Sequence, residues 1–191
     1  MLDKNPENIL TDDLQEILKE FASKNPNIIL CSNPFLKSQF LIELINSVDY
    51  SVIYLDFDLL YSGYVFSGMI SKNEKVDLYQ PEKNNIEKIF SDVAKKISEK
   101  KYLIVLDSLN GFYNIVTGVG SGIFINAVTM LLTSVARHKN SMIVISGMAR
   151  RKENEGWVLL PGGRHIIESK YSGLYFIRDS KKPDFKIIRS S

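Results

Sequence analysis

Cysteine and histidine are scarce in this chain of 191 residues. Cys31 is the one cysteine, so no disulfide can form within the chain, and we expect a reducing compartment, the cytoplasm. The two histidines do not have the spacing of metal ligands, and no Ser-His-Asp or Cys-His pattern stands out. These absences argue against a zinc site and against nucleophilic hydrolysis.

Long apolar runs and a large net charge are lacking as well. No apolar run approaches the roughly 20 residues of a membrane-spanning helix, and we expect no membrane partner. The acidic segment 1–7 lacks the apolar core of a secretory signal. The net charge of +2 is too small to indicate nucleic-acid binding by itself, so such binding would need a local basic patch. The length fits one domain, residues 1–191, with residues 1–10 expected to be flexible.

Four short apolar runs are typical of strands that are buried on both faces. They cover residues 27–31, 51–57, 102–106 and 141–146. Segments with helical periodicity lie before and between them, at 11–21, 40–45, 86–97 and 123–135. This alternation predicts an α/β fold, with a mainly parallel sheet flanked by helices.

Other segments have weaker patterns. Residues 58–81 lack a regular period, and residues 111–122 are expected to form a glycine-rich loop. Three later segments, 157–160, 171–178 and 185–189, are expected to be antiparallel strands at one sheet edge. Ligands of such sheets bind beyond the carboxyl ends of the strands, where residues 31–38, 56–58, 107 and 147–151 should meet.

The loop after the first strand contains no glycine. A phosphate-binding loop has the pattern G-x-x-x-x-G-K-[ST], in which the glycines let backbone amides surround the phosphates. Here Lys37 and Ser38 match, but Cys31 and Leu36 replace the glycines, and Pro34 removes an amide donor. We therefore expect no cofactor, and we favour an ordinary, solvent-facing first helical turn as the explanation of the Lys-Ser pair.

The order of these motifs resembles the core of the RecA/RadA recombinases, of the RadA-paralogue type with a degenerate Walker A loop, over residues 10–189. In that family the second strand ends in Asp-Thr-Glu, and the resemblance places Asp58 where the catalytic glutamate stands. Asp107, followed by Ser108, resembles the end of a Walker B strand. If ATP binds, the resemblance implies Lys37, Ser38 and Asp107 as its ligands, with Mg²⁺ held by Asp107 and Ser38.

The resemblance also covers the part that follows the fourth strand. Gly147 and Met148 replace the family's Asn-Gln pair, whose glutamine senses the terminal phosphate. The basic run 149–152 then occupies the position of the second DNA-binding loop, and residues 161–166 and 175–178 resemble later family motifs. The implied nucleic-acid-binding residues are Arg150, Arg151, Lys152 and Trp157, which offer charge for phosphates and a ring for a base. Glu153 and Glu155 reduce the local positive charge, and a solvated loop is the alternative explanation of this run.

The acidic residues at the strand ends have several interpretations. Asp56, Asp58 and Asp107 could cap the turns that follow them. Together with Lys37 and Ser38 they could hold Mg²⁺. We favour a third arrangement, in which an ion pair between Lys37 and Asp107 fills the site.

Three functions are compatible with these patterns. The favoured one is a RecA/RadA-like paralogue without ATP turnover, which binds DNA (single-stranded in preference to duplex) or a recombinase as an accessory in recombination and repair. The second is a weakly active ATPase that uses Lys37, Ser38, Asp58 and Asp107. The third is a ring-forming assembly protein that resembles the RNA-binding Elongator accessory subunits. Homo- or hetero-oligomers are compatible with each.

Overall fold

The computed structural model describes residues 8–9, 14–118, 120–152, 156–160, 170–179 and 185–189. The helices are α1 (Leu14–Ser23), α2 (Pro34–Ser47), α3 (Leu60–Phe66), α4 (Ile86–Glu99), α5 (Leu109–Ile115) and α6 (Ser121–Arg137). The strands are β1 (Asn8–Ile9), β2 (Asn27–Cys31), β3 (Val52–Asp56), β4 (Val76–Tyr79), β5 (Leu103–Asp107), β6 (Met142–Lys152), β7 (Gly156–Leu159), β8 (Gly173–Asp179) and β9 (Phe185–Arg189).

The described strands form one sheet with the order β1-β9-β8-β2-β6-β5-β3-β4, and β7 pairs with β6. All pairs among β2, β3, β4, β5, β6 and β8 are parallel. The pairs β1–β9, β6–β7 and β8–β9 are antiparallel. The expected α/β class, mainly parallel with antiparallel strands near the C-terminus, is confirmed.

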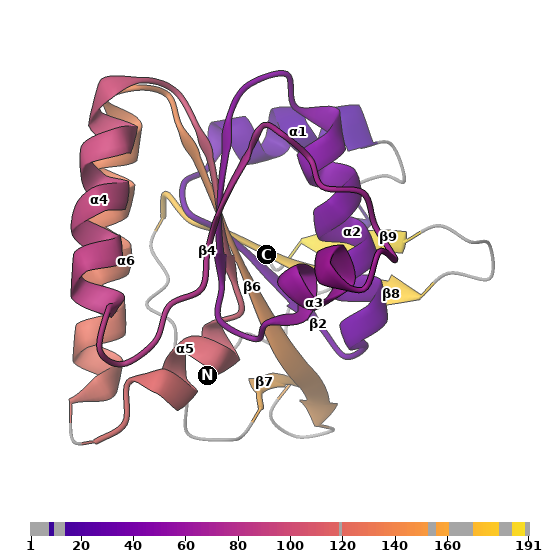
Figure 1. The fold of residues 1–191 in the computed structure, drawn as a ribbon. Coiled ribbons are helices and arrows are strands. Elements are labelled where there is room, and N and C mark those ends of the chain that lie inside the picture. The colour runs from indigo at the N-terminus through magenta and orange to yellow at the C-terminus, as the bar shows by residue number, and fades with distance from the viewer. Residues whose placement is uncertain are drawn as a thin grey trace.

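Helices cover both faces of the sheet (Figure 1). Helices α1, α2 and α3 pack on the face that carries Ile29, Tyr54 and Val105. Helices α4, α5 and α6 pack on the opposite face, which carries Leu30 and Leu106. The strands are therefore buried on both sides, which explains why their sequences are apolar runs without alternation.

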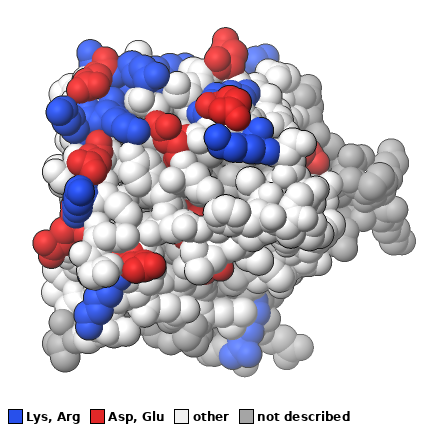
Figure 2. Space-filling view, viewed as in Figure 1, with Lys and Arg blue, Asp and Glu red and all other residues white. Residues whose placement is uncertain are grey.

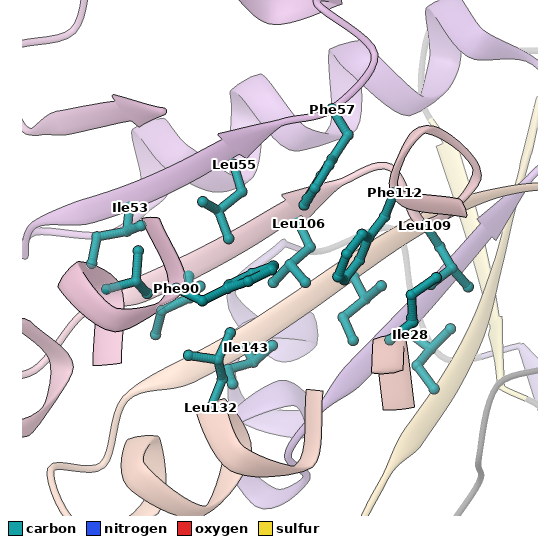
Figure 3. Close-up of a cluster of buried hydrophobic side chains, with 14 of the residues drawn as sticks. Ile28, Ile53, Leu55, Phe57, Phe90, Leu106, Leu109, Phe112, Leu132 and Ile143 are labelled. Atoms are coloured by element: carbon teal, nitrogen blue, oxygen red, sulfur yellow. The ribbon is translucent and has the colours of Figure 1, made fainter. Parts of the chain in front are cut away.

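Three phenylalanines form the centre of the second of these layers (Figure 3). The ring of Phe112, on α5, stacks on Phe57, which follows β3, with centroids 4.6 Å apart. It also contacts Phe90 of α4 at 5.3 Å. Phe112 thereby joins two helices to the end of a strand, directly below the carboxyl edge of the sheet.

Several local predictions were wrong. Residues 58–81 contain α3 and β4, and α5 lies partly within the segment expected to be a glycine-rich loop. Strand β8 is parallel to β2 and antiparallel only to β9. Helix α3 has seven residues and buries only Tyr61 and Ser62, so its sequence has no helical period to detect. Strand β4 forms the edge of the sheet and is largely half-buried, which weakens its apolar pattern.

Within the described part of the chain, no helix is both long and apolar enough to cross a bilayer.

Candidate functional site

The connection from β2 to α2 is short. Helix α2 begins at Pro34, so only Ser32 and Asn33 separate it from the strand. The Asn33 side chain caps the helix, because its Oδ1 accepts hydrogen bonds from the amides of Phe35 at 2.9 Å and Leu36 at 3.4 Å. The Lys37 amide donates to the Asn33 carbonyl at 3.1 Å. The amides of this first turn are thus used within the chain, and Pro34 has none to offer.

Lys37 extends from this turn into the protein and is only 1% exposed. Its Nζ lies 2.5 Å from Asp107 Oδ1 and 3.0 Å from Asp58 Oδ2. Burial by itself would lower the pKa of Lys37, but the negative charges of Asp107 and Asp58 outweigh burial and raise that pKa. Lys37 is therefore a charged ammonium, and the favoured ion pair with Asp107 is present.

Asp107 is completely buried and accepts further hydrogen bonds. Tyr54, on the neighbouring strand, donates its hydroxyl to Oδ2 at 2.6 Å. Ser146, on the other neighbouring strand, donates to Oδ1 at 2.6 Å. Burial, followed by the charge of Asp107, raises the pKa of Tyr54 well above its usual value, so the phenol keeps its proton. The carboxylate is held by three donors in a rigid network.

Two further acids lie beside this network. Asp56 is buried; its Oδ2 accepts from the Ser62 amide at 2.7 Å, and its Oδ1 has no hydrogen-bond partner among the described residues. Burial is the main cause that raises the pKa of Asp56. Asp58 is partly exposed, with a side-chain accessibility of 22%. Gly111 lets α5 approach Asp58, because a Cβ at residue 111 would lie 2.4 Å from Asp58 Oδ1.

Ser38 does not join this cluster. Its hydroxyl donates to the Pro34 carbonyl at 3.0 Å, within its own helix. In the part of the chain that the structure describes, no group of three or more His, Cys, Asp or Glu side chains is arranged to hold a metal. Of the predicted nucleotide ligands, the fold brings Lys37 and Asp107 together, beside Asp58, the candidate catalytic acid, and leaves Ser38 apart.

The basic run lies on a β-hairpin at the same end of the sheet. Strand β6 continues to Lys152 and pairs with β7, and the backbone register places Arg150 opposite Val158 and Arg151 opposite Trp157. Arg150 is exposed, whereas the side chains of Arg151, Lys152 and Trp157 lie outside the described residues. The segment 161–166 lies outside them too.

Asn110 holds the base of this hairpin. Its Nδ2 donates to the carbonyl of Met148 at 3.2 Å and to that of Leu160, and its Oδ1 accepts from the Met148 amide at 2.6 Å. Both strands of the hairpin are thereby fixed to the start of α5.

Sequence reasoning missed four residues that shape this region: Asn33, Tyr54, Asn110 and Ser146. Tyr54 could have been found, since it is a polar ring in an aliphatic strand, two residues before Asp56 and thus on the same face. Ser146 ends an apolar run, which is a weak pattern. The role of Asn110 depends on distant backbone groups, and its sequence context gives no indication of it.

No protein-family model matches the sequence, and no curated protein matches it either. Among solved structures, the crystal structure of the RadB recombinase is similar to this chain, with a TM-score of 0.55 and 13% sequence identity. The match covers 84% of this chain and 78% of that chain. At this identity the likeness concerns the fold, and the expected RecA-like α/β fold is confirmed.

Proposed function

We propose that this chain is a RecA/RadA-like paralogue that does not turn over ATP and acts as an accessory that binds DNA or a recombinase. The basic hairpin formed by β6 and β7 is its contact surface. The observation that carries the proposal is the ion pair of Lys37, because the lysine that would meet a phosphate is buried against Asp107 and Asp58.

The charges around Lys37 disfavour a nucleotide. Two unit charges 4 Å apart interact by about 4 kcal/mol near a protein surface. A terminal phosphate beside Lys37 would also approach the negative charges of Asp58 and Asp107, which oppose its attraction to Lys37 unless a cation accompanies it. Moving Lys37 to the phosphate would leave Asp107 buried with a reduced set of donors, which is costly.

The backbone of the loop supports the same proposal. A phosphate-binding nest needs amides that point together toward an empty space. Here Asn33 accepts from the amides of Phe35 and Leu36, and Pro34 has no amide hydrogen. The Ser38 hydroxyl, which would hold Mg²⁺, is bonded to Pro34. These residues therefore do not fit Mg·ATP in this conformation.

Thermal unfolding in the presence of Mg·ATP tests the absence of nucleotide binding. A ligand at 100 times its Kd stabilises a protein by about 2.7 kcal/mol. For a chain of this length that corresponds to about 5–11 °C in the midpoint. We expect no change. A rise in the midpoint, with ATP turnover that Asp58→Asn abolishes, would instead establish the weakly active ATPase.

The contact surface is tested by the salt dependence of binding to single-stranded DNA. The variant Arg150→Ala/Arg151→Ala/Lys152→Ala removes three candidate phosphate contacts, so the slope of log K against log salt should become shallower by about 2. The matched control, Lys83→Ala/Lys88→Ala/Lys95→Ala, removes three exposed lysines on or just before α4, outside the hairpin, and should leave the slope as it is. If the hairpin variant had the same salt slope as the unmodified protein, the hairpin would not be the contact surface.

A further inference from the structure

A cavity of about 680 Å³ lies at the end of the sheet opposite to Lys37. It is formed where α1, α2 and α6 end and where β5 and β6 begin. Its floor is apolar, with Phe21, Val48 and Met142 buried beneath it, and Ser141 adds a hydroxyl. This volume suits a ligand of the size of a nucleotide.

The rim of the cavity is basic. Among the described residues that line it, four side chains are cationic, those of Lys19, Lys24, Lys101 and Arg137, and one is a carboxylate, that of Asp49. Figure 2 shows that Lys and Arg side chains, interspersed with Asp and Glu, gather along the upper and left edges of the molecule, while the centre of that face is largely uncharged. An apolar floor with a cationic rim matches a ligand that has a ring and an anionic group.

Two tyrosines hold cations of this rim in place. Lys101 Nζ lies 4.2 Å from the centroid of the Tyr50 ring, and the Arg137 guanidinium lies 5.1 Å from that of Tyr171. Arg137 also donates to the Asn25 carbonyl at 3.1 Å. Tyr171 is 53% exposed, and Lys170 Nζ also lies over its ring, 4.9 Å from the centroid, so a base that stacks there takes the place of Lys170 over the exposed part of the ring.

The helix ends reduce the positive potential without reversing it. Each of α1, α2 and α6 directs its C-terminus toward the cavity, and a helix C-terminus acts as about half a negative charge. This effect falls off within the last turn, and Arg137 already bonds one nearby carbonyl. Four full positive charges exceed these partial charges and Asp49 together.

We propose that this cavity binds a nucleotide unit, with its phosphate among Lys19, Lys101 and Arg137 and its base against Tyr171. The site is separate from the basic hairpin. Met142 and Arg150 lie eight residues apart on β6, which is roughly 26 Å of strand. The cavity can therefore hold nucleic acid whether or not the hairpin does.

Fluorescence anisotropy with a labelled single-stranded oligothymidylate of about 16 nucleotides tests this site. All variants carry Arg150→Ala/Arg151→Ala/Lys152→Ala as well, so that the hairpin contributes nothing. Adding Lys19→Ala/Lys101→Ala should make the slope of log K against log salt shallower by about 1.4. The control Lys88→Ala/Lys95→Ala removes the same charge from α4 and should not change the slope.

Substitutions at Tyr171 distinguish a nucleotide from an anion that has no base to stack. Tyr171→Leu should weaken binding about 5- to 150-fold, the loss of one stacked base, whereas Tyr171→Phe should bind as the parent does. Displacement of the oligonucleotide by thymidine monophosphate would identify a free nucleotide as the occupant, and failure to displace it would identify a strand. If Lys19→Ala/Lys101→Ala had the same salt slope as its parent, the proposal would be overturned. It would also be overturned if Tyr171→Leu bound the oligonucleotide as tightly as its parent and polyglutamate displaced the oligonucleotide.

Discussion

Replacing Lys37 by methionine should lower the free energy of unfolding by about 3–5 kcal/mol, because Asp107 would stay buried without its cationic partner. For a chain of this length the midpoint of thermal unfolding should fall by about 6–20 °C. The charges of Asp107 and Asp58 raise the pKa of Lys37, so its stabilisation is complete below the ordinary lysine pKa of about 10.4. It is lost as the pH rises through the raised pKa, where the difference from the variant should shrink.

Two further variants separate the ion pair from the packing of the side chain. Lys37→Met/Asp107→Asn removes both charges while keeping an acceptor for Ser146, and it should recover part of the loss. Lys88→Met, at an exposed position on α4, should change the free energy of unfolding by less than about 0.5 kcal/mol. A loss that is the same in the single and the double variant would show that the ion pair is not the cause.

Replacing Phe112 by alanine should cost about 3–5 kcal/mol, since the ring is fully buried and its removal leaves a cavity between α4, α5 and the end of β3. Chemical denaturation with urea measures this loss as a lower midpoint at an unchanged slope. The effect should extend to the site, because α5 carries Gly111, against which Asp58 packs.

Phe66→Ala is the control for that experiment. Phe66 is 81% exposed, so truncation of its ring should change the free energy of unfolding by less than about 0.5 kcal/mol. If Phe112→Ala were as mild as Phe66→Ala, the three phenylalanines would not be the centre of this layer.

The central strands could be predicted because burial on both faces leaves a continuous apolar run, as in residues 103–106 of β5. The meeting of Lys37 with Asp107 followed from the rule that strand ends converge at one edge of a parallel sheet. These inferences depend on chemistry that is local in the sequence.

Other features depend on partners that are distant in the sequence. The orientation of β8 follows from its pairing with β2, more than a hundred residues earlier, and no pattern within β8 reports it. Ser38 has the residue type of a magnesium ligand, but the helix that begins at Pro34 offers its hydroxyl a nearer acceptor. Helix α3 escaped detection because it buries so little of its surface.

The bonds of Asn110 to Met148 and Leu160 have a consequence for the thermodynamics of any contact made by the hairpin. Ordering a backbone residue costs about 1–2 kcal/mol of conformational entropy. Because the base of the hairpin is already fixed, a partner does not have to supply that free energy for the residues next to Asn110. The entropic cost of association is smaller by that amount, so individually weak contacts at the base of the hairpin can still contribute to measurable affinity.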